Sequence, residues 1–171
     1  MTGNPMTAGQ VEETCIEAME QFFGADKKRI QHALAVLDYA KSIHSVEGGD
    51  PKVVLAAAIL HDIGIPAAEE KYGSIAGPYQ EKEGPPIARE MLEKAGFDAG
   101  TTDHVCDIIA DHHSAKTMDT TEFKVLWDAD WLVNIPNWHR DADKEQLKEL
   151  VEKVFKTRKG LTMAREIFLG E

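Results

Sequence analysis

The sequence predicts an all-α fold, a single-domain bundle of several helices around a buried central helix. Helix-forming residues and apolar residues spaced three and four apart recur along most of the 171 residues. No segment alternates apolar and polar residues as a half-buried strand does. Residues 53–60, VVLAAAIL, are apolar on every side, which is typical of a helix that other helices surround.

The expected helices follow one another with short connections. Their ranges are residues 8–23, 27–47, 51–63, 84–95, 102–113, 121–134, 144–156 and 161–169. Gly48-Gly49 and Asp50-Pro51 separate the second helix from the third, and Gly64 with Pro66 ends the third. The segment GSIAGPYQEKEGPP, residues 73–86, contains three Gly and three Pro and is expected to be a loop near a site.

Length and cysteine content indicate the class of protein. A chain of 171 residues is expected to form one domain, residues 1–171, with a substantial core that needs no disulfide or structural metal. Cys15 and Cys106 form no CxxC motif, so we expect two reduced thiols in a cytoplasmic protein. We expect no membrane partner, because no run approaches about 18 apolar residues and MTGNPMTAGQ does not resemble a signal peptide.

The charge of the chain argues against bulk nucleic-acid binding. Lys and Arg number 19 against 30 Asp and Glu, and the net charge of −11 does not favour the basic surface that phosphate-backbone contacts need. A small phosphorylated substrate is compatible with this charge if a cation lies in its site. Lys27, Lys28 and Arg29 form a basic run in DKKRI, which a solvated helix start also explains.

Polar residues interrupt the apolar faces of several predicted helices. His61 and Asp62 follow the apolar segment in AAILHDIGIP, and His32 shares a helix face with apolar residues four, seven and eleven positions later. His112 and His113 end another apolar stripe. Buried polar groups of this kind cost free energy unless hydrogen bonds or a cation satisfy them.

The segment FKVLWDADWLV adds two aspartates, Asp128 and Asp130. They flank the apolar face about equally, so periodicity does not decide which one faces a site. An aspartate buried opposite neutral histidines is satisfied by a divalent ion, which suggests a metal centre.

The order of His32, then His61-Asp62 in LHDIG, then an Asp in WDADWL resembles the HD-domain superfamily of metal-dependent phosphohydrolases. The resemblance covers about residues 28–135, and GLTMAREIF resembles a terminal helix of such proteins. It implies that His32, His61, Asp62 and Asp130 are metal ligands. Asp130 is preferred to Asp128 because ADWL matches the family's AD followed by a bulky residue and Leu.

Family members with two metals, such as the HD-GYP phosphodiesterases, have a further His before a Gly-containing helix and a later His-His pair. This chain has the pair, His112-His113, but alignment on Gly84 places Gln80 where the extra His would stand, with Glu81 and Glu83 nearby. The resemblance therefore implies one divalent ion, Mn, Fe, Co, Ni or Zn, rather than two. A second ion held by these residues is the alternative. The GYP element is absent, which argues against a cyclic dinucleotide substrate.

The resemblance implies a phosphatase or phosphodiesterase that hydrolyses a small phosphate ester, such as a nucleotide or related phosphomonoester, with a metal-activated water. Asp62 or Asp130 would orient the water, and His112 or His113 would protonate the leaving group or neutralise developing charge. Two alternatives remain: a noncatalytic signalling module that binds a metal and a nucleotide, and a di-iron HD-type oxygenase.

Arg29 and Lys116 are candidate phosphate contacts, although both residues are equally compatible with exposed positions. Trp127, Trp131 and Trp138 lie on or just after the DAD helix, and Trp131 stands where many relatives place a basic residue. For these tryptophans, core packing or a partner interface is favoured over stacking on a nucleobase. The sequence leaves the formation of a homo-oligomer open.

Overall fold

Helices make up most of the computed structural model, which describes residues 4–171. In chain order they are α1 (Ala8–Phe23), α2 (Lys27–Glu47), α3 (Pro51–Leu60), α4 (Ile65–Tyr72), α5 (Gly77–Lys94), α6 (Ala99–Asp111), α7 (Thr121–Trp138), α8 (Lys144–Val154), α9 (Arg158–Ala164) and the π-helical segment η1 (Arg165–Leu169). No residue in this described range lies in a strand. The predicted all-α class is confirmed.

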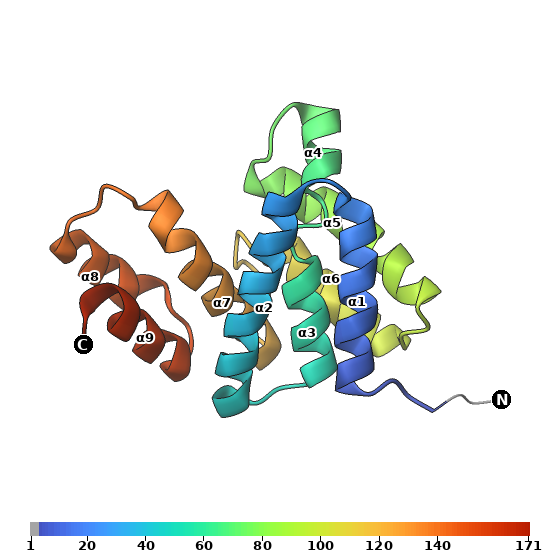
Figure 1. Cartoon of the computed structure of the whole chain (residues 1–171), viewed down its shortest axis with the longest axis horizontal. Helices are drawn as coiled ribbons and strands as arrows, with labels where there is room; N and C mark the ends of the chain where they lie inside the picture. Colours follow the sequence, from blue (N-terminus) through green and yellow to red (C-terminus); the bar gives the residue numbers. More distant parts are fainter. Residues whose placement is uncertain (1–3) are drawn as a thin grey trace.

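The central helix of the bundle is α3. Residues 53–60 are all buried, and α3 packs against α1, α2, α6 and α7 (Figure 1). The helix begins after Asp50, whose side chain accepts a hydrogen bond from the backbone N–H of Lys52, with Pro51 in the first turn. It ends at His61, so the His-Asp pair lies at the inner end of a buried helix.

The range Pro51–Tyr72 is long and apolar enough to cross a membrane, which the sequence analysis did not expect. It has 22 residues, and its most apolar 18-residue window has a mean hydropathy of 1.4. Of that window, 72% is buried inside the bundle, and the helical path breaks at the turn over residues 61–64. Packing of α3 on all sides therefore accounts for the apolar composition.

The expectation of a loop over residues 73–86 is wrong, because α5 begins at Gly77 and runs through Pro85 and Pro86. A proline in the first turn of a helix removes no intrahelical hydrogen bond, so Pro78 is compatible with this start. Pro85 and Pro86 remove donors from the helix interior, and packing of α5 on α4 and α6 offsets that loss.

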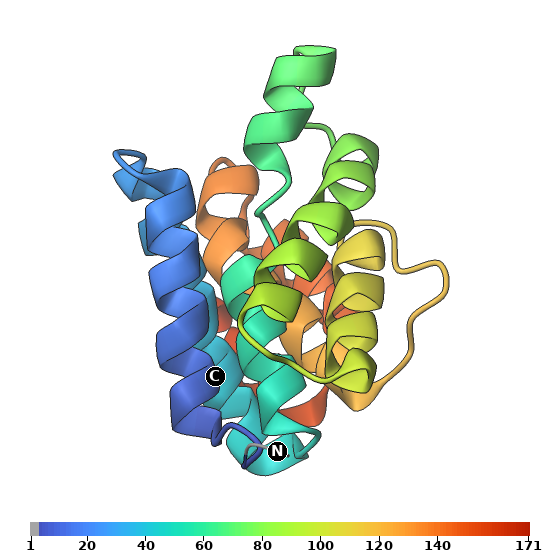
Figure 2. The ribbon, with the colours of Figure 1, turned by 90° about the vertical axis from the view of Figure 1, so that its right-hand side faces the viewer.

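The helix α4 is absent from the helices that the sequence predicts, because Gly64 and Pro66 are typical of a helix end. In the structure Pro66 lies in the first turn of a new helix, where its missing N–H costs nothing. This short helix projects beyond the rest of the bundle (Figure 2).

Glycines allow α5 to approach the His-Asp turn closely. A Cβ atom at Gly64 would lie 2.6 Å from the backbone nitrogen of Gly84, and one at Gly84 would lie 2.7 Å from Cγ2 of Ile109. A Cβ atom at Gly77 would lie 2.9 Å from Cβ of His113. These close approaches bring α5 against the two segments that carry the predicted site.

Other helix ends differ from the predictions by a few residues. The helix α6 ends at Asp111, so His112 and His113 follow it, and α7 continues past residue 134 to Trp138. The predicted helix over residues 161–169 is α9, which begins at Arg158, followed by η1. Cys15 and Cys106 are buried free thiols.

Asp128 anchors the C-terminal helices to α7. Its carboxylate is completely buried and accepts hydrogen bonds from the backbone N–H of Lys156 (2.8 Å) and Thr157 (2.8 Å) and from the Thr157 hydroxyl (2.7 Å). Burial raises the pKa of Asp128 to about 6. An added Cβ atom at Gly160 would collide with this carboxylate. Asp128 therefore has a structural role and faces α9.

Replacing Asp128 is expected to destabilise the protein. Asp128→Ala leaves two backbone N–H groups and a hydroxyl without their acceptor, which lowers the free energy of unfolding by about 2–4 kcal/mol. Denaturant unfolding measures the change. The control Asp107→Ala, at an exposed position of α6, is expected to change it by less than about 0.5 kcal/mol. Equal stability of the two variants would contradict the anchoring role.

Candidate metal centre

Four side chains from α2, α7 and the end of α3 meet inside the bundle. Nε2 of His32 lies 3.1 Å from Oδ1 of Asp130, 3.2 Å from Oδ2 of Asp62 and 3.3 Å from Nε2 of His61. Nε2 of His61 lies 3.3 Å from the same oxygens of Asp62 and Asp130. The structure thus brings together the four side chains that the sequence predicted as ligands, with Asp130 rather than Asp128 among them.

Neighbouring groups orient two of these ligands. Nδ1 of His61 donates a hydrogen bond to the carbonyl of Ala58 (2.8 Å), which leaves Nε2 directed toward the cluster. The amide nitrogen of Asn134 donates to Oδ1 of Asp130 (2.8 Å). Both contacts are of the kind that hold metal ligands in a defined orientation.

The cluster fits a divalent cation. Two ligand atoms about 2.1 Å from one ion, at the angles of tetrahedral or octahedral coordination, lie about 3.0–3.4 Å apart. The separations of 3.1–3.3 Å between the nitrogen and oxygen atoms fall in this range. His61 is fully buried, and a metal ion there satisfies both imidazoles and both carboxylates together.

The charges of the cluster also favour a cation. Burial acts to lower the pKa of His32, but hydrogen bonds to Asp130 and Asp62 outweigh it and raise this pKa to about 9. Burial also acts to lower the pKa of His61, but Asp62 and Asp130 outweigh it and hold this pKa well above its usual value. Burial acts to raise the pKa of Asp62 and of Asp130, but the charge of His61 outweighs it and holds both well below their usual range. Asp62 and Asp130 are therefore both ionised near pH 7, and their negative charges attract a cation.

A second group of ligating atoms shares Asp62. Asp62, His112 and His113 offer atoms that all lie within 4.8 Å of one another. Nδ1 of His112 donates to the carbonyl of Ile109 (2.6 Å), and its buried Nε2 lies 3.5 Å from Oδ1 of Asp62 with no hydrogen-bond partner within residues 4–171. Asp62 thus directs one oxygen to each group, which is the arrangement that a second ion would need.

Gln80, expected where two-metal relatives have a histidine, contacts His113 instead. Its amide nitrogen donates to the carbonyl of Ile75 (2.6 Å), and its Oε1 accepts a hydrogen bond from Nε2 of His113 (3.0 Å). Burial, with a smaller effect of the neighbouring His112 charge, lowers the pKa of His113 to about 4. The ring of His113 is therefore neutral near pH 7, with Nδ1 left as an acceptor.

The two glutamates expected near a second ion are held elsewhere. Glu81 accepts hydrogen bonds from the backbone N–H (3.2 Å) and the hydroxyl (2.6 Å) of Ser114. Glu83 accepts hydrogen bonds from Lys71 (2.7 Å) and from the hydroxyl of Tyr72 (3.0 Å). The structure does not bring Glu81 or Glu83 to the second group.

A cavity of about 230 Å³ opens onto the metal centre. Its lining includes His32, Asp62 and Asp130 from the first group and His113 from the second. The other residues that line it are Lys28, Arg29, Ile65, Ile75, Gln80, Asn134 and Trp138. A ligand in this cavity would touch the candidate metal ligands directly.

Arg29, Lys28 and Lys116 differ in whether they line the cavity and whether they form ion pairs. Arg29 lines the cavity but forms ion pairs with Asp26 (2.9 Å) and Glu69 (3.0 Å). Lys28 lines the same cavity and forms no ion pair within the described range 4–171. Lys116 is exposed and does not line the cavity. Lys28 is thus the cation at this cavity that no carboxylate neutralises.

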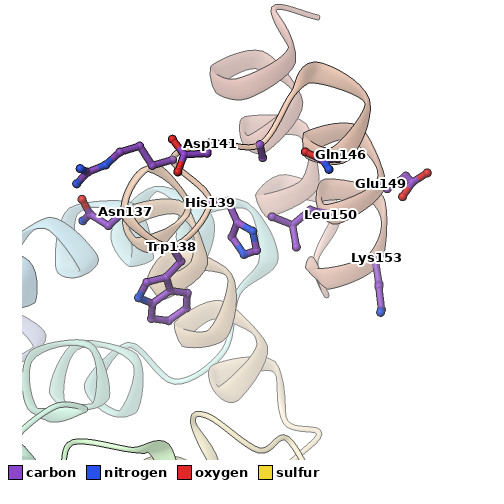
Figure 3. Close-up of a pocket in the computed structure, with 10 residues that line it drawn as sticks. Asn137, Trp138, His139, Asp141, Gln146, Glu149, Leu150 and Lys153 are labelled. Carbon is purple, nitrogen blue, oxygen red and sulfur yellow. The ribbon is translucent and has the colours of Figure 1, made fainter.

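A larger groove of about 720 Å³ lies between the end of α7 and α8 (Figure 3). The picture shows His139 and Leu150 facing each other across it. None of the predicted metal ligands lines this groove. We therefore place the candidate active site at the smaller cavity, because three of the four predicted ligands, His32, Asp62 and Asp130, line it.

The family model of the HD domain matches residues 29–135, a range that includes both ligand groups. The chain belongs to the HD-domain family. HD domains form a superfamily of metal-dependent phosphohydrolases, and the family assignment supports a hydrolase. The fold of this HD domain is therefore the one that the resemblance implied.

A solved structure is similar to this HD domain over most of its length. It is the crystal structure, at 1.45 Å resolution, of a predicted HD superfamily hydrolase from an uncultured Thermotogales bacterium. The two chains share 26% identity with a TM-score of 0.70, over 92% of this chain and 85% of the other. Among curated proteins, none matches this chain significantly.

Sequence reasoning missed several residues that shape the centre of this HD domain. Asn134 follows Asp130 by four positions, a helical spacing that could have indicated the contact between them. Lys28 was noted only as part of a basic run, and nothing in the local sequence distinguished it from Arg29. Ile75 lay in a segment expected to be a loop, with no pattern to connect it to the ligands.

Removing one shared ligand is expected to empty the metal centre. Asp62→Ala deletes the carboxylate that faces both ligand groups, so we expect metal affinity to fall at least about tenfold. Metal content per chain, measured on protein purified without chelator, tests this. Wild-type protein and the exposed-site control Asp107→Ala are expected to retain the ion. Equal metal content in Asp62→Ala would contradict the assignment.

Proposed function

We propose that this HD domain hydrolyses a small phosphate ester, a nucleotide or a related phosphomonoester, by means of a metal-activated water. The observation that carries the proposal is a cluster of four candidate ligands beside a cavity. Three of them, His32, Asp62 and Asp130, line the cavity together with Lys28, which forms no ion pair within residues 4–171. The volume of about 230 Å³ is below the roughly 300–1,000 Å³ of pockets for drug-sized ligands, which favours a small substrate.

His32, His61, Asp62 and Asp130 would hold the ion. When bound, a divalent ion supplies a water of lowered pKa and polarises a phosphoryl oxygen. The ionised carboxylate of Asp62 or Asp130 is suited to accept a hydrogen bond from the attacking water and so orient it toward phosphorus.

His113 is better suited to accept a hydrogen bond than to act as the acid. It lines the cavity, but its Nε2 proton is donated to Gln80 and its pKa is lowered to about 4. A neutral ring with Nδ1 free can accept a proton or a hydrogen bond from water or from a substrate hydroxyl. His112 lies deeper, and its Nε2 lies 3.5 Å from Oδ1 of Asp62.

A phosphate-release screen tests the hydrolase proposal. Protein loaded separately with Mn, Fe, Co, Ni or Zn is incubated with nucleotides and other phosphomonoesters. We expect release by the wild type and by Asp107→Ala, and a loss of at least about 100-fold in Asp62→Ala, because the ion and the water-orienting carboxylate are lost together. Absence of release from every ester by metal-replete protein would overturn the proposal.

The second ligand group makes the di-iron oxygenase a specific alternative. Such an enzyme needs two irons, and Asp62, His112 and His113 would supply ligands for the second. Iron near two per chain with a redox-active spectrum would favour this alternative. Phosphate release with one ion per chain would favour hydrolysis, and phosphate binding without release would favour the noncatalytic module.

Lys28 is expected to contact the phosphate of the substrate. Lys28 lines the cavity and has no carboxylate partner among residues 4–171, so Lys28→Ala is expected to raise KM about 3- to 10-fold at low salt, and less at high salt. The matched control is Lys27→Ala, one residue earlier, which is exposed and does not line the cavity. Equal KM values for the two variants would show that Lys28 does not bind the substrate.

A further inference from the structure

Trp138 is an exposed aromatic side chain at the metal-site cavity. It is the last residue of α7, is 50% exposed and lines the same cavity as the metal ligands. It follows Asp130 and Asn134 at intervals of four residues, which keeps the three side chains near one face of α7. Eight residues of helix place its Cα about 12 Å from that of Asp130.

The other two tryptophans of α7 are half-buried and pack against neighbouring side chains. Trp127 donates its indole N–H to the carbonyl of Val154 (3.0 Å), and the ammonium group of Lys156 lies 4.8 Å from its ring centroid. Trp131 packs near Trp127, with ring centroids 6.4 Å apart. These contacts agree with the packing role predicted for Trp127 and Trp131. Trp138 differs from them because it is exposed.

The ring of Trp138 is supported on one side. Trp131 meets it edge-to-face, with centroids 5.4 Å apart and an interplanar angle of 88°. Trp131 in turn lies against His139, with centroids 6.0 Å apart and planes 27° apart. Figure 3 shows Trp138 at the end of α7 and His139 on the side nearer α8. The support restrains the Trp138 ring while half of its surface stays open to solvent.

A second exposed apolar side chain lines the same cavity. Ile75, in the connection between α4 and α5, is 46% exposed. Large apolar side chains that stay exposed beside a polar site are typical of surfaces that contact the apolar part of a ligand. Trp138 and Ile75 thus add an apolar contact surface to a cavity whose other lining is mainly charged or polar.

We propose that Trp138, with Ile75, binds a planar aromatic ring in the leaving group of the substrate. The inference rests on the proposed function, in which the phosphate lies at the metal centre and Lys28. A ring joined to the phosphate through a sugar, as in a nucleoside monophosphate, can reach from the ligands to the end of α7. Trp138 is then the residue that distinguishes such esters from sugar phosphates that carry no aromatic ring.

Calorimetric binding to metal-loaded protein tests the inference, with adenosine 5′-monophosphate and ribose 5-phosphate as probes. Stacking of a base on an aromatic side chain contributes about 1–3 kcal/mol, so the wild type is expected to bind the nucleotide about 5- to 150-fold more tightly. Trp138→Ala is expected to lose most of this preference, and Trp138→Phe to retain part of it. The control Tyr79→Ala removes an exposed aromatic ring that does not line the cavity.

The kinetic signature separates this inference from the hydrolase proposal. Stacking predicts that Trp138→Ala raises KM for the nucleotide with little change in kcat. Equal wild-type affinity for the two probes, or a preference unchanged in Trp138→Ala, overturns the role of Trp138 even if both esters are hydrolysed. Binding that depends on Trp138 without phosphate release supports the role of Trp138 and overturns hydrolysis.

Discussion

Burial of a charged pair at the end of the central helix is the constraint on which the rest of the structure depends. The eight apolar residues 53–60 place His61 and Asp62 in the interior, where unpaired charges are costly. The bundle meets that cost by bringing His32 from α2 and Asp130 from α7 to within 3.3 Å of His61. Helices that surround α3 therefore also complete the candidate metal centre.

The helix α7 combines structural and functional roles along its length. Asp128 accepts hydrogen bonds from the start of α9 and attaches the C-terminal helices, while Asp130, only two residues later, faces the histidines. One turn further, Asn134 holds Asp130, and Trp138 ends the helix at the rim of the cavity. A shift of α7 along its axis would therefore disturb the anchor and the ligand together.

The other side of the centre depends on close packing of α5. Gly64 and Gly84 allow the His-Asp turn and α5 to approach more closely than any side chain would permit. This approach brings Gln80 to His113, from whose Nε2 its side-chain oxygen accepts a hydrogen bond. The same helix engages Glu81 and Glu83 in contacts with Ser114 and Lys71, away from the ligands.

The sequence by itself determined the features that depend on local spacing. Helical periodicity and the apolar run of α3 predicted the all-α class and the central helix, and the family resemblance supplied His32, His61, Asp62 and Asp130. Only the tertiary structure decided which aspartate of DAD is an anchor and that residues 77–86 are helical. It also decided that Arg29 pairs with Asp26 and Glu69, whereas Lys28 forms no ion pair within residues 4–171. The reason is physical: these outcomes depend on contacts between segments far apart in the chain, whose energies override local propensity and cannot be derived from spacing within one segment.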